Sequence, residues 1–534
     1  MNAKIKPFVL FFILIVQSPL ISTGFSPEYP GETTTLLNNL KKNDIYLNSA
    51  QTCLDNLIKH GRDNYGEKKS PIFVSILDIN SLTCPQNPLA LDENWRVIRR
   101  ERRNPAGANL FTDQPLINSM FAMSRITKNK IYADQAKKYI SYYLKNLTDQ
   151  KGLIWWGGHR HYDVFTDQMT GHLLNWHEIH GGTQIQWQIL WSINAKAVKK
   201  EIQAIWQWHV IDKQTGETNR HDDALRGCDF PFTAGSMIEA FAFLYTKTND
   251  KVWLERSKLL ANYFWLLRDK NTNMIPECPT AGTQRFDGTT FATDITGPYC
   301  HSLLRTYVLT KDDMFRQQAI AYLTAYKKFG FDKNTGNFYG AIKINGVPIP
   351  GPRLPASDKP EEFGNNQQYA QYEPRGYLDL WEPYILGSEF PLETAQCYAF
   401  AYGLSNDPNM LFPAQCFAKL IQKTPTNWNQ CGISWYSDYS RTFGNSGTYA
   451  DKYGRAISFF IDMYVLTRRQ EYLASAKKFA DEAIDKLYAN GMFKGHPAKP
   501  YYESTDGVGI LLYALIELDQ TLNGTLGNFE LDNW

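Results

Sequence analysis

Histidines are unevenly spread along this chain of 534 residues. Seven of the ten lie between residues 159 and 221, within or near the motifs WWGGHR (155–160), WHEIH (176–180) and NRHDD (219–223). These seven are His159, His161, His172, His177, His180, His209 and His221. Imidazole nitrogens and carboxylates are common ligands of divalent transition metals. The clustering therefore raises the hypothesis of a metal site in this window.

Two histidines and one carboxylate would make such a site, with positions left open for a substrate. His159 follows Gly157 and Gly158, which let the backbone bend, Glu178 lies within WHEIH, and His221 follows an arginine. WHEIH is not the HExxH motif of zinc proteases, because its second histidine is one position short for helical i, i+4 geometry. For each histidine alone, the alternative is a hydrogen-bonded structural residue.

The order of the motifs resembles that of one enzyme family. GGH, then HE about twenty residues later, then RH about forty residues after that, is similar to the family 2 polysaccharide lyases, the metal-dependent pectate lyases with an (α/α) barrel. The resemblance covers about residues 155–226. It implies that His159, Glu178 and His221 bind a manganese-like divalent metal and that Arg220 is the catalytic base. His180 stands where the family pattern has a lysine.

The reaction implied is β-elimination on a uronic acid, which gives an unsaturated uronate. Removing the C5 proton builds negative charge on the adjacent carboxylate, and a bound metal stabilises that charge. Chemistry alone would make Arg220 a carboxylate clamp, since guanidinium groups stay charged in proteins. The family resemblance is what makes it the base.

Aromatic and cationic residues near the histidines are candidates for binding a uronate-containing oligo- or polysaccharide. Aromatic residues form 14% of the chain, and their flat rings can stack on sugars. We assign substrate binding to Trp155, Trp156, Arg160, His180 and Arg226. For the tryptophans the alternative is burial in the core. For the arginines it is a solvated position or a structural salt bridge.

A helical rhythm predicts the fold class. Five segments share one pattern, in which a helix with apolar residues three and four apart is followed by a polar turn and a second helix with an early aromatic residue. The marker aromatics are Tyr132, Trp253, Phe315, Phe412 and Tyr472. Three of the four gaps between them are close to multiples of about 60 residues, enough for a helical hairpin. We predict an all-α protein, an (α/α) toroid of six or seven hairpins forming one large domain over residues 25–534. An open helical solenoid is the alternative.

The N-terminus predicts export. Lys4 and Lys6 precede an apolar run over residues 8–16, and small residues follow near position 24. We interpret residues 1–24 as a cleaved signal peptide of a secreted or periplasmic protein. An exported chain with eight cysteines permits disulfides, and Cys53 with Cys84 or Cys278 with Cys300 are candidate pairs.

Net charge bears on the partners. Lysines and arginines number 56 against 54 acidic residues, so no whole-molecule field favours nucleic acid or an anionic membrane.

Two other function classes remain open. A glycoside hydrolase on the same ring would need two carboxylates across a cleft, with Glu178, Asp222, Asp223 and Asp506 as candidates. A non-catalytic saccharide-binding protein would use the aromatic residues alone. A sugar epimerase of the toroid class fits an exported protein less well.

Overall fold

Helices provide most of the regular structure in the computed structural model. The described residues are 44–86, 107–158, 160–171, 176–179, 181–280, 288–351, 375–381, 389–426 and 447–525. All of them belong to one compact unit, Asp44–Trp534. The predicted signal peptide lies outside the described residues.

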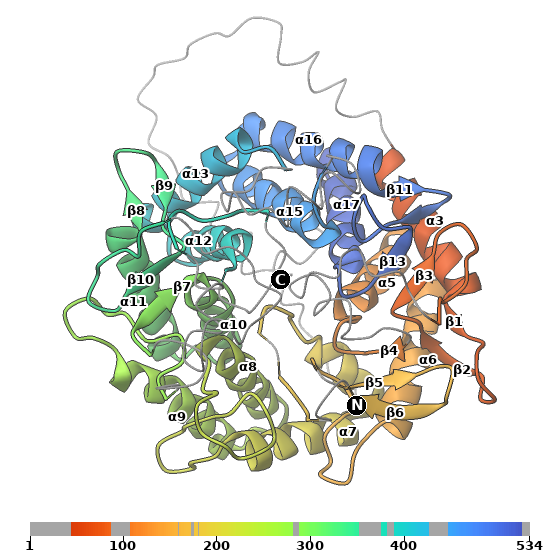
Figure 1. Cartoon of the computed structure of the whole chain (residues 1–534), viewed down its shortest axis with the longest axis horizontal. Coiled ribbons are helices and arrows are strands. Elements are labelled where there is room, and N and C mark those ends of the chain that lie inside the picture. The colour runs from red at the N-terminus through yellow and green to blue at the C-terminus, as the bar shows by residue number, and fades with distance from the viewer. Residues whose placement is uncertain are drawn as a thin grey trace, which may run out of the picture. The chain divides into compact units, whose positions relative to one another are not determined.

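Within this unit the helices form two concentric layers around a centre (Figure 1). The inner helices are α5 (Gln114–Thr127), α8 (Pro231–Thr248), α10 (Cys300–Thr310), α12 (Pro391–Ser405), α15 (Ala450–Thr467) and α17 (Val508–Leu522). The outer helices are α3 (Ile45–His60), α6 (Ile131–Asn146), α7 (Trp187–His209), α9 (Lys251–Leu267), α11 (Asp313–Phe329), α13 (Pro408–Lys423) and α16 (Gln470–Leu487). A π-helical turn, η2 (Ile295–Tyr299), precedes α10. Inner helices are buried on several sides, as in α17, whereas outer helices such as α16 bury one face.

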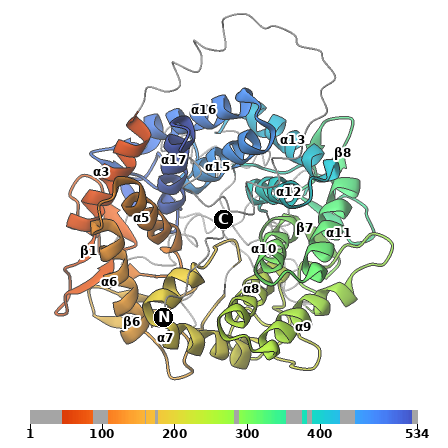
Figure 2. The ribbon, with the colours of Figure 1, turned by 180° about the vertical axis from the view of Figure 1, so that it is seen from behind.

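Two ends of the described chain close the ring. The C-terminal helix α17 packs against α3, α5 and α15, so the first described helix lies beside the last, as both views show (Figures 1 and 2). An open solenoid would leave its terminal repeats apart. The predicted (α/α) toroid is therefore confirmed.

The polar turns within the hairpins explain the rhythm seen in the sequence. Asn249, Lys311 and Asn406 end inner helices with positive φ, and an aspartate follows each one. Asp250, Asp312 and Asp407 then cap the outer helices, accepting hydrogen bonds from the backbone two residues on. Each of these turns thus consists of one residue in the left-handed helical conformation and an aspartate that caps the N-terminus of the next helix.

The marker aromatics lie on outer helices, and four of the five lie three residues after the turn. Tyr132, Trp253, Phe315 and Tyr472 are buried there, but Phe412 is 45% exposed. In α13 the position three residues after the cap Asp407 is Met410, which is buried. Phe412 was therefore the wrong marker in the weakest repeat.

The helix α7 departs from the simple repeat. Asn194 has non-helical φ and ψ inside it, and its side-chain oxygen accepts a hydrogen bond from the Ala197 N–H at 3.0 Å. Asn194 thus caps a second helical segment, so α7 is two helices joined by a kink.

Short strands lie in the connections between helices. They are β1 (Arg62–Asp63), β2 (Ser70–Phe73), β3 (Ile76–Asp78), β4 (Gly107–Ala108), β5 (Arg160–Asp163), β6 (Gln168–Gly171), β7 (Thr290–Ala292), β8 (Phe331–Asp332), β9 (Asn337–Phe338), β10 (Ala341–Lys343), β11 (Tyr488–Ala489), β12 (Met492–Phe493) and β13 (Tyr501–Glu503). The largest sheet among the described residues has three antiparallel strands, in the order β4-β5-β6. Its strands β5 and β6 belong to the histidine-rich segment.

The expectation about the cysteines can be compared with the structure. The seven described cysteines are all free, so the candidate pairs Cys53–Cys84 and Cys278–Cys300 are wrong. Among the described helices, none combines the length and the apolar character needed to span a lipid bilayer.

Candidate active site

Backbone bridges bring the predicted site segments together. Gly157 forms a parallel bridge with Glu178, and Glu178 forms an antiparallel bridge with His221. The Gly158 N–H donates to the Glu178 carbonyl at 3.3 Å, and the Ile179 N–H donates to the Arg220 carbonyl at 3.0 Å. Three segments distant in sequence therefore meet at Glu178.

Glycine is required where the first of these segments approaches the second. Gly157 has φ +108°, and a Cβ atom there would lie 2.3 Å from the Glu178 carbonyl oxygen. The side-chain amide of Asn109, which follows β4, donates to the carbonyls of Gly157 at 2.7 Å and Arg160 at 3.0 Å. The bend before residue 159 is thus fixed from both sides.

Three of the predicted catalytic and metal-binding side chains converge. Glu178 Oε1 lies 3.3 Å from Arg220 Nε and 3.6 Å from His221 Nε2. Arg220 Nε also donates to His221 Nε2 at 3.3 Å. All three residues are buried, which strengthens electrostatic interactions between them.

The donor set of this cluster fits a divalent metal. Glu178 Oε1 lies 3.6 Å from His221 Nε2. Metal–nitrogen and metal–oxygen bonds are about 2.0–2.2 Å each, so the distance between the two atoms is shorter than the sum of two such bonds. Burial lowers the pKa of His221, which favours the neutral imidazole that metals bind. One ion can therefore contact both side chains.

The third predicted ligand, His159, lies outside the described residues, as does His180. Among the residues that are described, no group of three or more His, Cys, Asp or Glu side chains is placed to hold a metal ion. The metal site therefore stays a prediction.

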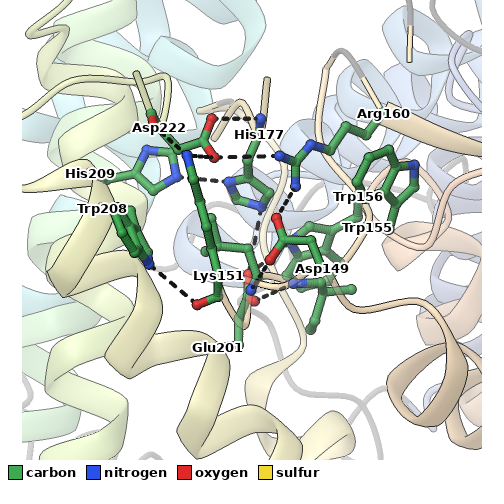
Figure 3. A network of polar contacts seen from close by, with 12 residues as sticks. Asp149, Lys151, Trp155, Trp156, Arg160, His177, Glu201, Trp208, His209 and Asp222 are labelled. Atoms are coloured by element: carbon green, nitrogen blue, oxygen red, sulfur yellow. Dashed lines mark hydrogen bonds and ion pairs between the residues drawn. The ribbon is translucent and has the colours of Figure 1, made fainter. Parts of the chain in front are cut away.

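His177 and His209 form a buried pair (Figure 3). His177 Nδ1 is 2.8 Å from His209 Nε2, and His209 Nδ1 is 3.0 Å from the Asn219 carbonyl. A carbonyl only accepts, so His209 Nδ1 must carry a proton. Burial lowers the pKa of His209 to about 4, so the ring is neutral and its Nε2 accepts from His177 Nδ1–H. The pair thus links the residues that precede Glu178 and Arg220.

Glu201 of α7 ends this chain of contacts. It accepts hydrogen bonds from the Ile154 N–H at 2.6 Å and from Trp156 Nε1 at 2.9 Å, and His177 Nε2 lies 3.7 Å from its Oε1. Burial raises the pKa of Glu201 to about 8 and lowers that of His177 well below its usual value. Both groups are therefore mainly uncharged at neutral pH.

Asp222 fastens the two site segments to each other (Figure 3). Its Oδ1 accepts from the His177 N–H at 3.0 Å, and its Oδ2 pairs with Lys151 at 2.8 Å and Arg160 at 3.4 Å. Burial raises the pKa of Asp222, but the Lys151 hydrogen bond and the two cations outweigh it and lower the pKa overall. Arg160 also pairs with Asp149 at 2.6 Å.

The predicted sugar-binding residues lie mainly in contacts within the protein. Trp155 donates through Nε1 to the carbonyls of His161 at 3.0 Å and Thr170 at 2.8 Å, and Arg160 stacks over its ring at 4.4 Å. The buried ring of Trp156 contacts Phe111 and Trp187. These placements favour the alternatives, burial for the tryptophans and a structural salt bridge for Arg160.

Arg226 forms a bidentate pair with Glu217. Both hydrogen bonds are 2.7 Å long, and 72% of the Arg226 side chain is exposed. The structure thus gives Arg226 a surface ion pair, and its role in substrate binding stays a prediction.

Carboxylates proposed for the hydrolase alternative are already paired. The buried Asp506 accepts from Lys499 Nζ at 2.9 Å, and Asp222 is held as described above. Asp223 lies 3.9 Å from His221 Nδ1. This arrangement favours a structural role for Asp506 and Asp222.

A cavity of about 150 Å³ adjoins the site. Gly157, Gly158, Gly181 and Gly182 line it on the side of the histidine-rich segment, and residues of α12 and α15 line it across from them. The cavity therefore lies next to the backbone segments on either side of Glu178.

Residues 92–235 match the family described as periplasmic pectate lyase. The matched range contains Glu178, Arg220 and His221 and covers less than half of the chain. A pectate disaccharide-lyase from Dickeya dadantii is 28% identical over 130 residues, which is 23% of this chain and 23% of that protein. The match thus spans under a quarter of the length of this relative. Both matches confirm the predicted resemblance to the pectate lyases and support a polysaccharide lyase.

Solved structures of similar shape include enzymes of several kinds. A cellobiose 2-epimerase from Bacillus thermoamylovorans is 13% identical, covering 91% of this chain and 100% of that one, with a TM-score of 0.45. A family 76 α-mannanase from Bacteroides thetaiotaomicron is 12% identical, covering 91% and 98%, with a TM-score of 0.47. A heparin-specific unsaturated glucuronyl hydrolase is 12% identical, covering 91% and 100%, with a TM-score of 0.45. Likeness of this degree carries no information about the reaction.

Several residues of the site had no distinct signal in the sequence. Glu201, Asp149 and Lys151 are charged residues on a helix and in a turn, and nothing in their local sequence marks them as buried or paired. Asn109 likewise follows a segment without a motif. Their roles follow only from tertiary contacts: Glu201 of α7 meets Ile154 and Trp156, and the other three residues meet partners in other segments.

Proposed function

We propose that the protein is a lyase that cleaves uronate-containing, pectate-like glycans by β-elimination. The observation that carries this proposal is the convergence of Glu178, Arg220 and His221 within the range that matches the pectate lyases. The curated relative, a pectate disaccharide-lyase, points to the same substrate class.

Glu178 and His221 would hold a divalent metal together with His159, the ligand implied by the family resemblance. Such an ion, when bound, would stabilise the negative charge that develops on the substrate carboxylate. The same positive charge would favour a deprotonated Arg220, because a neighbouring like charge lowers the pKa of a cationic group.

Arg220 would act as the base. It would take the C5 proton of the uronate, the electron pair of that C–H bond would form the C4–C5 double bond, and the C4 oxygen would leave with the rest of the chain. Stacking of the guanidinium over Phe230, with Cζ 4.9 Å from the ring centre, helps to fix its orientation.

One assay tests this function. The purified protein is incubated with polygalacturonate and other uronate polymers, and the ultraviolet absorbance of an unsaturated product is followed with and without a chelator. Absorbance that rises and is lost with chelator supports the proposal. Elimination insensitive to chelator contradicts the metal site, and reducing ends released without absorbance indicate hydrolysis.

Variants of Arg220 test its role. We expect Arg220→Ala to lower kcat by at least about 100-fold, the usual contribution of a general base. Arg469→Ala, at an exposed position of the outer layer, is the matched control and should behave as wild type. An Arg220→Lys variant with near-full kcat would argue against a special role for the guanidinium.

We also propose that the protein is exported, with residues 1–24 removed. The matched family is described as periplasmic. N-terminal sequencing of the protein recovered from its native compartment should begin near residue 25, and a retained Met1 in that fraction would contradict the proposal.

A further inference from the structure

The cavity beside the site contains a buried lysine. Lys452, in the first turn of α15, lines the cavity, and the residue is only 3% exposed. The same cavity is lined by Gly157 and Gly158, of which Gly157 is bridged to Glu178, and by Gly181 and Gly182. Lys452 therefore reaches the same open volume as the backbone of the candidate active site.

No hydrogen bond or ion pair joins the Lys452 ammonium to any residue in the part of the chain that the structure describes. The other buried lysine in this region, Lys499, is arranged differently, with Glu503 at 2.6 Å and Asp506 at 2.9 Å. A buried charge is costly unless it is paired. The contrast indicates that an anion supplied from outside completes the Lys452 site.

The neighbouring charged groups are already engaged. Arg455, one helical turn further along α15, pairs with Glu393 at 2.9 Å and donates to the Gly182 carbonyl at 2.9 Å. Glu389 accepts from the Asp379 N–H at 3.3 Å. Asp451 also lines the cavity, but adjacent residues of a helix do not face each other.

The backbone of α15 offers no substitute for the side chain. Its first N–H groups, those of Ala450 and Asp451, donate to the carbonyls of Gly495 at 2.9 Å and Asp506 at 3.0 Å. Lys452 and Arg455 are the two cationic residues that line the cavity, and of these Arg455 already has an ion partner, Glu393.

We propose that Lys452 binds a carboxylate of the glycan at a subsite next to the one that reacts. This inference rests on the proposed function and names a specificity determinant for it. A uronate chain carries one carboxylate on every sugar, so when one of them lies at Glu178 and His221, the neighbouring sugar presents another. An ammonium binds such a group through charge-assisted hydrogen bonds.

Binding measurements in a background without turnover test the proposal. In Arg220→Ala protein, the Kd for a short oligogalacturonate is compared with the Kd for its fully methyl-esterified form, by calorimetry. We expect an added Lys452→Met substitution to weaken binding of the charged oligomer by roughly 10- to 100-fold and to leave the ester unaffected. Lys452→Arg should keep most of the affinity. Lys251→Met, an exposed lysine at the start of α9, should change neither value.

Two binding results would overturn the inference. One is a Lys452→Met protein that binds the charged oligomer as tightly as its parent. The other is an equal loss of affinity for both oligomers, which would show that Lys452 maintains the shape of the cavity and does not bind a carboxylate.

Thermal unfolding supplies a readout that needs no substrate. Lys452→Met should leave Tm unchanged or raise it, because it removes a buried charge that lacks a protein partner among the described residues. Lys499→Met should lower Tm, because it removes the buried cation that pairs with both Glu503 and Asp506. A fall in Tm for Lys452→Met as large as that for Lys499→Met would overturn the inference.

The two proposals can fail separately. If wild-type protein eliminates but Lys452→Met does not discriminate between the charged oligomer and its ester, only the subsite is wrong. If wild-type protein does not eliminate but binding depends on Lys452 and on the carboxylates, the lyase function is wrong and the subsite stands.

Discussion

At the scale of single residues, the site combines a charged cluster with three supporting residues that are mainly uncharged. Glu178, Arg220 and His221 lie within 3.6 Å of one another through their nearest polar atoms. Behind them, His177 and His209 are neutral and Glu201 is mainly protonated at neutral pH. These three residues therefore help to fix positions without adding net charge.

This support predicts how stability depends on pH. Glu201 has a usual pKa of 4.5 and a folded pKa of about 8, so between these values the folded protein keeps a proton that the unfolded chain releases. Its contribution is fully present below pH 4.5 and is lost as pH rises through about 8. His209 has a usual pKa of 6.5 and a folded pKa of about 4. Its contribution is present above pH 6.5 and is lost as pH falls toward about 4.

Chemical unfolding of Glu201→Gln at several pH values checks the alkaline side. We expect wild type to lose about 1 kcal/mol or more between about pH 5 and pH 8 through this group, and the variant to lose less. Glu255→Gln, exposed on α9, should keep the wild-type slope. An identical slope in wild type and Glu201→Gln would show that Glu201 does not titrate in this way.

The sequence could identify the charged cluster but not its support. The motifs GGH, HE and RH pointed to Glu178, Arg220 and His221 because those residues stand in short, distinctive contexts. Glu201 sits in a helix among other charged residues, and its burial depends on how α7 packs against Trp156. Likewise, the prediction for Arg160 could not foresee its partners Asp149 and Asp222, which approach from other segments.

At the scale of elements, the site is carried by connections rather than by helices. The helical rhythm could be predicted because the turn chemistry repeats at Asp250, Asp312 and Asp407. The kink of α7 at Asn194 could not, since it depends on one local contact rather than on periodicity. Phe412 was the wrong marker because the pattern required an aromatic residue, whereas the repeat position three residues after Asp407 holds Met410.

The bend at Gly157 predicts a variant that separates the segments. Gly157→Ala would place a Cβ atom 2.3 Å from the Glu178 carbonyl oxygen and also strain a backbone at φ +108°. We expect a loss of activity of at least about tenfold, because a displacement of about 1 Å at a catalytic group is costly. Initial rates of elimination measure this loss.

Gly336→Ala is the matched control. Gly336 has φ +73°, with nothing within 4 Å of a Cβ atom, so the substitution imposes backbone strain alone. We expect it to lower stability by about 1 kcal/mol with no loss of activity. Equal activities for the two variants would contradict a positional role for Gly157.

At the scale of the whole described unit, closure of the ring depends on α17. All its residues are buried, and its N-terminal part touches α5 closely. A Cβ atom on Gly509 would lie 2.4 Å from the Leu116 backbone nitrogen, and the Ser119 hydroxyl donates to the Gly509 carbonyl at 2.9 Å. At this point of the ring, the backbone of α17 therefore packs directly against the backbone of α5.

Gly509→Ala should therefore weaken the ring as a whole. We expect a loss of about 1–3 kcal/mol from overpacking against backbone that cannot move aside. Circular dichroism and tryptophan fluorescence should report one coincident transition at lower Tm, because a closed ring has no terminal repeat to fray. Gly403→Ala, where a Cβ atom would meet only the end of Leu466 at 3.3 Å, should be neutral or stabilising. Separate transitions by the two probes would contradict a cooperative ring.

Single backbone bridges at Glu178 join the three segments of the candidate active site. The connections on either side of α7, residues 147–186 and 210–230, carry the reacting groups, and we call them the cassette. The helices of the ring, α7 included, form the frame around it. Such a division lets substitutions in the cassette accumulate without unsettling the helices that hold the ring closed. A combinatorial library aimed at altered substrate preference is thus best confined to this cassette and the facing turn of α15, with the remaining helices left untouched.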